Sequence, residues 1–408
     1  MFDMLRGRVI RRLQQLEAAG AHRILRPPAG VDLSSNDYLG LATHGLVIER
    51  MAEAAIREGS GSTASRLLRG ERASFAALEK RFAHFKGTEA ALYFGSGYAA
   101  NLGALTSFLE PEDLVFSDEL NHASLIDGLR LARARRVIYT HLDVDALGRL
   151  MEAENAPGQK FLVTESLFSM DGDRAPLAAY AELCKATNTA LIIDEAHAVG
   201  IYGARGSGLI EETGIESETF LSINTGGKAL GVCGAFAAGP AWAIDYMIQR
   251  ARTFIFSTAP PPAVAAALDA ALTLISDEPE RRRRLMELVD YLHVKLAEHG
   301  IRVPPGRSQI IPIVIGDNAR SVSVAAALQA QGFDVRAIRP PTVPDGTARL
   351  RISVNANLDR ETLCRFSAAL AAALDEHRAL RMTSDALRQI ALEGKQNLNA
   401  RGISSGDK

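Results

Sequence analysis

The sequence has little cysteine, no long apolar run and almost no excess of charge. Its three cysteines, Cys184, Cys233 and Cys364, lie far apart with no paired spacing. That pattern argues against a disulfide framework, a zinc site or a redox pair, so we expect a reducing compartment and no bound metal. No apolar run approaches the roughly 18 to 20 residues of a membrane span, and no signal-peptide pattern opens the chain. We therefore expect a cytoplasmic protein without a membrane partner.

The charge balance and the composition are those of an ordinary globular protein. The formal net charge is −2 and the pI is near 6.5, so the electrostatics give no reason to expect nucleic acid as a partner. Any anionic ligand must be bound by a local group of residues. With 408 residues, of which 47% are hydrophobic and 23% charged, the chain is long enough for one large core and a smaller second domain.

Four segments can be distinguished along the chain. They are an N-terminal helix and strand segment at 1–45, a large ligand-binding domain at 46–280, a small α+β domain at 281–380 and a partly disordered tail at 381–408. The first helix is basic and amphipathic enough to be compared with a mitochondrial presequence. Asp3, Glu17 and the absence of serine argue against that interpretation, and we expect this helix to pack on the body of the protein.

In the large domain, apolar strand-like runs alternate with helical stretches. The runs are Ala90–Phe94, Asp113–Phe116, Arg136–Tyr139, Phe161–Thr164 and Ala190–Ile193. This alternation predicts an α/β fold in which helices cover a mainly parallel sheet, with ligands at the carboxyl ends of its strands. A charged helix over 279–300 connects to the second unit. We interpret its arginine run, Arg281–Arg284, as a solvated helix face rather than a nucleic-acid patch.

One such strand ends in a carboxylate. Asp194 closes the run that begins at Leu191, and His197 follows three residues later, where a loop begins. A buried carboxylate needs a cationic partner, and a protonated pyridine nitrogen is such a partner. Taken alone, an aspartate that caps a helix beside a core histidine is an equally good interpretation.

A single lysine stands in a glycine-rich loop after the next strand. Lys228 closes the segment Ser222–Lys228, which carries hydroxyl and amide side chains and two glycines. An amine in a confined site has a lowered pKa and can form an imine, so Lys228 is the candidate nucleophile. The loop in isolation would fit a surface lysine, and the upstream Asp194 motif favours the chemical interpretation.

Three weaker motifs gain meaning only in combination. The turn around Gly97 opens a helix and could hold a phosphate, although neither it nor the loop before Lys228 fits the nucleotide P-loop. His122 could lie over a flat ring or cap a helix, and no second ligand at metal spacing accompanies it. Ser169 could reach a cofactor oxygen or simply form the turn before Asp171.

Taken in order, eight motifs resemble the α-oxoamine synthases, a branch of the fold-type I enzymes that depend on pyridoxal 5′-phosphate (PLP). They are SSNDYLGL, FGSGYAAN, NHAS, TESLFSMDGD, IIDEAHAVG, NTGGK, FSTAPPPA and AIRPPTVPDGTARLRIS. The resemblance covers nearly the whole chain. It implies PLP, a large and mainly parallel seven-stranded sheet domain with a small C-terminal α+β domain, as in aspartate aminotransferase, and an acyltransferase activity. Within the branch, residues 337–353 most resemble members that join L-alanine to pimeloyl-CoA, or to a pimeloyl carrier protein, in biotin biosynthesis.

The resemblance also implies a role for individual residues. Lys228 would be the Schiff-base lysine and general base, Asp194 the partner of the pyridine nitrogen, and His122 the residue stacked on the ring. The expected contacts of the cofactor's phenolic oxygen are Ser169 and His197. The expected phosphate ligands are Gly97, Tyr98 and Thr225, joined by Ser257 or Thr258 of a second subunit in a homodimer with shared active sites. The expected substrate ligands are Asn36 and Arg351 for the amino-acid carboxylate and Arg23 or Arg26 for the far end of the acyl chain.

Other interpretations remain open at this point. Other members of the branch use glycine or serine with another acyl-CoA, as 2-amino-3-ketobutyrate ligase, 5-aminolevulinate synthase and serine palmitoyltransferase do. An aminotransferase, or a partner subunit without chemistry of its own, fits less well because Lys228, Asp194 and His122 are all present. Two departures from the branch are a shorter chain after Gly30 and a glycine at 226 where relatives carry a larger residue.

Overall fold

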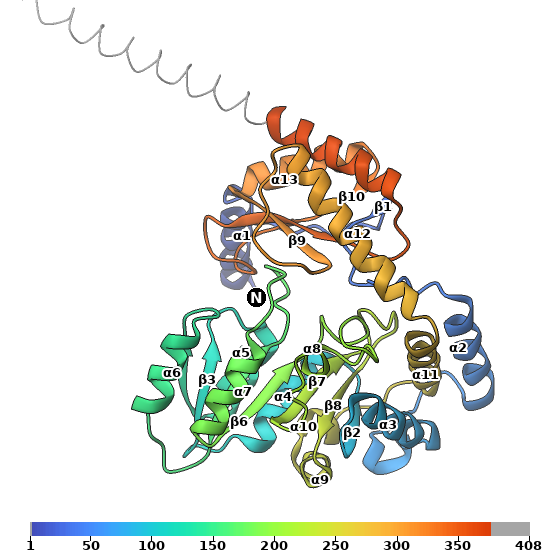
Figure 1. Cartoon of the computed structure of the whole chain (residues 1–408), viewed down its shortest axis with the longest axis vertical. Helices are drawn as coiled ribbons and strands as arrows, with labels where there is room; N and C mark the ends of the chain where they lie inside the picture. The colour runs from blue at the N-terminus through green and yellow to red at the C-terminus, as the bar shows by residue number, and fades with distance from the viewer. Residues whose placement is uncertain (1, 377–408) are drawn as a thin grey trace, which may run out of the picture.

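The computed structural model describes residues 2–376 and is built around a seven-stranded sheet (Figure 1). The strand order is β2-β8-β7-β6-β5-β3-β4. The strands are β2 (Ala90–Phe94), β3 (Leu114–Asp118), β4 (Arg135–Tyr139), β5 (Lys160–Glu165), β6 (Thr189–Asp194), β7 (Thr219–Thr225) and β8 (Ala235–Gly239). Only β8 runs antiparallel to its neighbours. The predicted α/β class with a mainly parallel seven-stranded sheet is confirmed.

Helices bury both faces of this sheet, which is why the middle parts of its inner strands are mostly apolar. On β6, Leu191 and Ile193 belong to one hydrophobic core, whereas Ile192 belongs to the other. The helices on the first side are α2 (Gly45–Glu58), α3 (Ala73–Lys86), α6 (Val144–Ala153), α7 (Leu177–Ala186) and α11 (Pro262–Asp277). Those on the second side are α4 (Gly97–Phe108), α5 (Ala123–Ala132), α9 (Ala241–Arg250) and α10 (Arg252–Ile255). Two short elements, η1 (Arg66–Gly70) and α8 (Leu209–Thr213), lie in the connecting loops.

The parallel strands end together in polar residues. The last residues of β3, β5, β6 and β7 are Asp118, Glu165, Asp194 and Thr225. Because carboxyl ends of parallel strands share one edge of the sheet, the fold gathers these side chains there.

A second, smaller unit carries its own sheet. In it β12 (Ala348–Ser353) pairs antiparallel with both β11 (Ala337–Ile338) and β9 (Ile310–Gly316), and α13 (Asn318–Ala330) lies beside them. The N-terminal β1 (Val31–Asp32) pairs with β10 (Phe333–Asp334), so the start of the chain is joined to this unit. The chain is helical again over 360–376. In Figure 1 the long α12 (Pro279–Glu298) connects the two units.

Two expectations about surfaces need correction. The first helix forms, as α1 (Asp3–Ala18), but it buries none of its side chains. The arginine run on α12 is not a uniformly solvated face, because Arg282 is buried and donates hydrogen bonds to the carbonyl oxygens of Ile275 and Ala204. The predicted boundary between residues 280 and 281 falls in the first turn of α12, and the predicted tail lies outside the described residues. Within residues 2–376, no helix is both long and apolar enough for a membrane span.

Candidate active site

Asp194 is a buried carboxylate at the edge where the parallel strands end. Its side chain accepts hydrogen bonds from Asn101 Nδ2 at 2.7 Å and from the backbone N–H of Ala196 at 2.8 Å. Glu165, the last residue of β5, is its partner in the sheet register. Burial, followed by the charge of Asp194, raises the pKa of Glu165 to about 8. One of these two neighbouring carboxyl groups therefore holds a proton near neutral pH.

Lys228 and His197 form a pair beside this edge. Lys228 Nζ lies 2.8 Å from His197 Nε2. Burial lowers the pKa of Lys228 to about 8, and the nearby carboxyl groups of Asp194 and Glu165 act in the opposite direction. Burial also holds the pKa of His197 well below its usual value, and the nearby charge of Lys228 adds to that effect. The site therefore combines a neutral imidazole with an amine that is partly deprotonated near neutral pH, as a nucleophile or general base requires.

Arg351 brings an available cation to the same place from the small unit. It lies on β12, is buried, and donates hydrogen bonds to Tyr38 Oη at 3.0 Å and to Ser353 Oγ at 2.8 Å, as well as to the carbonyl oxygen of Ser169. Among the described residues no carboxylate forms an ion pair with it, whereas nearby Arg349 pairs with Asp171. A buried guanidinium without a carboxylate partner is suited to binding a carboxylate ligand.

The start of α4 provides an anion-binding position. Ser96 caps the helix by accepting from the N–H of Ala99, and the first-turn N–H groups of Gly97 and Tyr98 have no acceptor within the helix. A Cβ atom at Gly97 would lie 2.6 Å from Thr225 Cγ2, so a larger residue would close this position. Two residues expected from a second subunit, Ser257 and Thr258, are exposed in the single chain.

His122 occupies the position of a helix cap and also faces the cavity. It precedes α5, and its Nδ1 lies 2.7 Å from Ser124 Oγ and accepts from the N–H of Ser124. Burial lowers its pKa, so the imidazole is neutral near pH 7. Both interpretations of His122, as a cap and as a ring-stacking residue, are compatible with this geometry.

A cavity of about 1,040 Å³ joins six of the fourteen predicted site residues. Those that line it are Asn36, His122, Ser169, His197, Lys228 and Arg351. Arg23 and Arg26 lie in a neighbouring cavity of about 390 Å³, and the two cavities share Arg336, Ile338 and Thr342. The Arg23 side chain donates a hydrogen bond to Thr342 Oγ1, and the Arg26 side chain donates one to Gln329 Oε1, each at 3.3 Å. Both therefore lie next to the main cavity and outside it.

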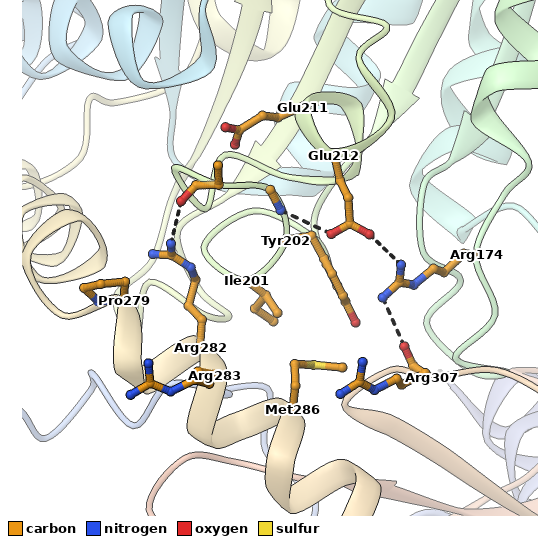
Figure 2. A pocket seen from close by; sticks show the side chains of 12 residues that line it. Arg174, Ile201, Tyr202, Glu211, Glu212, Pro279, Arg282, Arg283, Met286 and Arg307 are labelled. Carbon is orange, nitrogen blue, oxygen red and sulfur yellow. Dashed lines mark hydrogen bonds and ion pairs between the residues drawn. The ribbon is translucent and has the colours of Figure 1, made fainter.

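Another cavity, of about 890 Å³, opens between the large unit and α12 (Figure 2). Three of its four arginines pair with carboxylates: Arg174 with Glu212 at 2.7 Å, Arg307 with Asp290 and Arg283 with Glu287. The fourth, Arg282, donates to backbone carbonyl oxygens. Charges neutralised in this way suit a structural contact between the units better than a site of reaction.

The cluster beside Lys228 fits PLP. Asp194 would pair with the pyridine nitrogen, and the start of α4 would hold the phosphate. Lys228 follows β7, whose Ile223 is the register partner of Asp194 and whose Thr225 lies against Gly97. Within the described part of the chain, the buried atoms Asn101 Oδ1, Glu165 Oε1 and Ser166 Oγ lack a hydrogen-bond partner, as expected where a polar ligand completes a site.

Three functional residues were not singled out by the sequence patterns. Glu165 lies in the quoted motif TESLFSMDGD and Tyr38 in SSNDYLGL, but neither motif shows that these side chains meet Asp194 or His197. Gln309 is fully buried, donates to the carbonyl oxygen of His197 at 2.8 Å and accepts from Tyr202 Oη at 2.7 Å. The unusual Gly226 has a local reason, because a Cβ there would lie 2.6 Å from Cys233 O.

Comparison with known proteins agrees with this geometry. A family model for aminotransferase class I and II matches residues 28–370. An 8-amino-7-oxononanoate synthase from Anaeromyxobacter dehalogenans is 47% identical over 378 residues, which cover 89% of this chain and 94% of the relative. The enzyme of that name from Geobacter sulfurreducens is 44% identical over 88% of this chain and 96% of its own.

Solved structures show the same fold. A serine palmitoyltransferase from S. paucimobilis with PLP and myriocin bound superposes with a TM-score of 0.84 at 28% identity, covering 91% of this chain and 97% of its own. The 8-amino-7-oxononanoate synthase of Francisella tularensis gives a TM-score of 0.74 at 26% identity over 86% of this chain and 99% of its own.

Proposed function

Because the chain belongs to the aminotransferase class I and II family, among the 8-amino-7-oxononanoate synthases, we propose that it makes 8-amino-7-oxononanoate from L-alanine and a pimeloyl thioester. The reaction is a PLP-dependent acyl transfer with loss of CO2, and it belongs to biotin biosynthesis. The thioester is pimeloyl-CoA or a pimeloyl carrier protein. The observation that carries the proposal is the meeting of Lys228, His197 and Arg351 in one cavity, in a chain so similar to these enzymes.

The substrate carboxylate is held from the small unit and the N-terminal segment. Arg351 offers a planar fork to a carboxylate, and Asn36 lines the same cavity. A short amino acid held there by its carboxylate places its Cα toward Lys228. When bound, PLP withdraws electron density from that carbon and so makes its proton removable.

The chain's own groups move the protons. The free amine of Lys228 removes the Cα proton as a general base, and His197 Nε2 accepts a hydrogen bond from the resulting ammonium group. A bond then forms between alanine Cα and the thioester carbonyl carbon, and the carbon–sulfur bond breaks. The sulfur leaves as a thiolate and takes a proton from solvent. The alanine carboxylate departs as CO2, and Lys228 returns a proton to the same carbon.

The remaining assignments are part of the proposal. Asp194 partners the pyridine nitrogen and His122 lies on the ring. Ser169 and His197 contact the phenolic oxygen. The phosphate ligands proposed are Gly97, Tyr98 and Thr225, with Ser257 or Thr258 from a second subunit. We propose a homodimer with shared active sites, in the cytoplasm, because the exposed Ser257 and Thr258 are then used by the partner's site. Arg23 or Arg26 meets the far carboxylate of the acyl chain from the adjoining cavity.

Product analysis tests the proposal directly. The PLP-loaded protein is incubated with L-alanine and pimeloyl-CoA, and in parallel with glycine or serine and acetyl-CoA, succinyl-CoA or palmitoyl-CoA. We expect 8-amino-7-oxononanoate by mass spectrometry and the highest kcat/KM for the first pair. Turnover of glycine or serine in preference to alanine would assign the chain to another α-oxoamine synthase activity. Accumulation of pyridoxamine phosphate with alanine alone would indicate an aminotransferase.

A further inference from the structure

The hydroxyl of Tyr38 lies between the proposed carboxylate site and the residue that contacts Lys228. Its oxygen is 3.0 Å from Asn36 Oδ1, 2.7 Å from His197 Nδ1 and 3.0 Å from the Arg351 Nη2 that donates to it. The side chain is fully buried. It comes from the segment between β1 and α2 rather than from a strand of either main sheet, and it contacts residues of both units.

Counting protons at this hydroxyl leaves two arrangements. A phenol has one proton to donate and two lone pairs. Arg351 can only donate and Asn36 Oδ1 can only accept, so the proton of Tyr38 goes either to Asn36 or to His197 Nδ1. A neutral imidazole carries one proton, on one nitrogen or the other, and its buried position keeps His197 neutral.

The two arrangements match the two protonation states of Lys228. When Tyr38 donates to Asn36, His197 donates from Nδ1 to Tyr38, and its Nε2 accepts from an ammonium group on Lys228. When Tyr38 donates to His197 Nδ1, the imidazole proton is on Nε2, where it can donate to a free amine. The orientation of the Tyr38 hydroxyl therefore decides whether His197 Nε2 accepts from the ammonium form of Lys228 or donates to its free amine.

We propose that Tyr38 is a positioning residue that couples carboxylate binding at Asn36 and Arg351 to the protonation of Lys228, by setting the tautomer of His197. The inference rests on the proposed function, which assigns the substrate carboxylate and the general base to these residues. A bound carboxylate balances the charge of Arg351, which otherwise disfavours the ammonium form of Lys228. With Tyr38 holding His197 in the accepting tautomer, Lys228 becomes a stronger base once the amino acid is in place.

Other groups also act on this chain of hydrogen bonds and stay constant in the test. The charged and polar groups that face Lys228, His197 and Tyr38 are Asp194 on β6, Glu165 on β5, His122 before α5, Arg351 on β12 and Gln309 before β9. The first two favour a positive charge on Lys228, and Arg351 opposes it. Removing one hydroxyl leaves all of them in place, so a change in the titration of Lys228 reports on Tyr38.

The test compares Tyr38→Phe with Tyr180→Phe, which removes a hydroxyl from a buried tyrosine on α7 outside the cavity. The cofactor-free proteins are labelled with trace acetic anhydride across a pH series, with and without excess acetate as a carboxylate probe. Mass spectrometry of the Lys228 peptide gives the pKa of the amine. We expect acetate to raise that pKa in the wild type and in Tyr180→Phe. In Tyr38→Phe we expect a pKa lower by about one unit and a smaller response to acetate, because only the direct charge effect of Arg351 on Lys228 remains.

A second readout uses the PLP-loaded proteins. For Tyr38→Phe we expect kcat/KM for L-alanine to fall about tenfold, and the acidic limb of the kcat profile to move to lower pH. An unchanged Lys228 titration together with weaker alanine binding would overturn the proposal, because Tyr38 would then support Arg351 alone.

Two further outcomes keep the proposal separate from its premises. If Tyr38→Phe does not fold, 3-fluorotyrosine at position 38 preserves the shape and makes the hydroxyl a stronger donor and a weaker acceptor. We expect it to lower the pKa of Lys228, as Tyr38→Phe does. A Lys228 pKa that does not change would contradict the coupling. A wild-type protein that makes no 8-amino-7-oxononanoate refutes the proposed function, while the labelling experiment still decides the coupling.

Discussion

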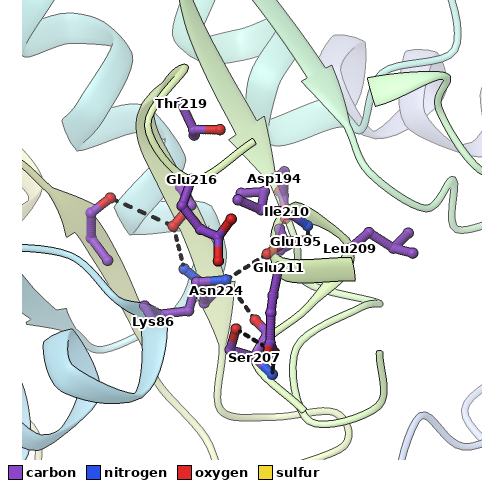
Figure 3. Close-up of polar contacts among 12 residues, drawn as sticks. Lys86, Asp194, Glu195, Ser207, Leu209, Ile210, Glu211, Glu216, Thr219 and Asn224 are labelled. Atoms are coloured by element: carbon purple, nitrogen blue, oxygen red, sulfur yellow. Dashed lines mark hydrogen bonds and ion pairs between the residues drawn. The ribbon is translucent and has the colours of Figure 1, made fainter. Parts of the chain in front are cut away.

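Two lysines lie beside the short segment that follows β6, and the protein treats them in opposite ways. Lys86, the last residue of α3, is almost fully buried, with its amine 2.5 Å from Glu195 Oε2 and 2.5 Å from the carbonyl oxygen of Ser207 (Figure 3). Lys228 is half-buried, borders the main cavity and has the neutral imidazole of His197 as its partner. A lysine paired with a carboxylate stays charged, whereas one paired with an imidazole can lose its proton.

The surroundings of the two pairs extend this contrast. Glu195 Oε1 accepts from the N–H of Ile210, so the Lys86 pair fastens the 207–211 loop to the end of β6 (Figure 3). Gly208 has a φ of +133°, and a side chain there would collide with the Glu195 carboxylate. In the part of the site beside Lys228, the buried atoms Asn101 Oδ1, Glu165 Oε1 and Ser166 Oγ have no hydrogen-bond partner among the described residues, so a ligand could bind to them. The Lys86 pair is therefore a satisfied buried charge, whereas the surroundings of Lys228 include buried polar atoms that a ligand could satisfy.

The largest expected effect is the loss of chemistry in Lys228→Ala. We expect kcat/KM to fall by about 10⁴-fold or more, because in the proposed function this one amine serves as cofactor anchor and general base. The absorbance band that PLP shows when bound to the wild-type protein should also be lost or displaced in this variant. The unfolding free energy should stay within about 1 kcal/mol of the wild type, since no ion pair is removed. Lys185→Ala, at an exposed lysine on α7, is the matched control.

A Lys228→Ala protein that retained turnover would remove the distinction between the two lysines. A Lys228→Ala protein that lost as much unfolding free energy as a Lys86 variant would also remove this distinction.

The opposite result is expected for Lys86→Met. Leaving Glu195 buried without its cation should lower the unfolding free energy by about 3–5 kcal/mol. The activity per folded molecule should remain within about tenfold of the wild type, because Lys86 does not line the main cavity. Urea denaturation followed by circular dichroism measures the first quantity, and initial rates well below the melting temperature measure the second.

A double variant separates charge from packing at this pair. In Lys86→Met with Glu195→Met, both charges are replaced by apolar side chains of similar length, and most of the stability lost in the single variant should return. Additive losses would mean that packing, and not the unpaired charge, explains the effect.

The sequence was enough to single out Lys228 as the candidate nucleophile, but not to show that Lys86 is a buried charge. Lys228 follows an apolar strand in a glycine-rich loop, and Asp194 ends another strand, so local patterns and strand order place both at one edge. The mainly parallel sheet was predictable for the same reason. Lys86 closes an ordinary amphipathic helix, and only the tertiary fold buries its amine against Glu195, 109 residues away.

The contacts of Tyr38 were out of reach for a similar reason. Its hydroxyl meets His197 across 159 residues and Arg351 across 313 residues of sequence, and no local periodicity encodes such a meeting. Arg282 is a case in which the local pattern gave the wrong expectation, because a run of four arginines indicates a solvated helix face. One of the four is nevertheless buried against backbone carbonyl groups.

The smallest effect extends the comparison from lysines to histidines. His141 is mostly buried and contacts two carboxylates, Asp118 at 2.8 Å from Nδ1 and Asp173 at 2.9 Å from Nε2. Burial favours its neutral form, but the hydrogen bonds and charges of the two aspartates prevail and raise its pKa to about 10. His197, by contrast, has no carboxylate partner among residues 2–376, and burial keeps it neutral. We therefore expect His141, like Lys86, to be a structural charge.

That difference gives His141 a pH signature that His197 lacks. The folded-state pKa lies above the usual value of about 6.5, so the stabilisation by His141 is complete below about pH 6.5 and is lost as the pH rises toward 10. His141→Asn should lower the unfolding free energy by on the order of 2 kcal/mol at pH 6, and by progressively less up to pH 9.5. Urea titrations at several pH values, with the exposed His84→Asn as control, measure this. A deficit that does not change with pH would mean that the aspartates hold a neutral imidazole, and that His141 belongs with His197 instead.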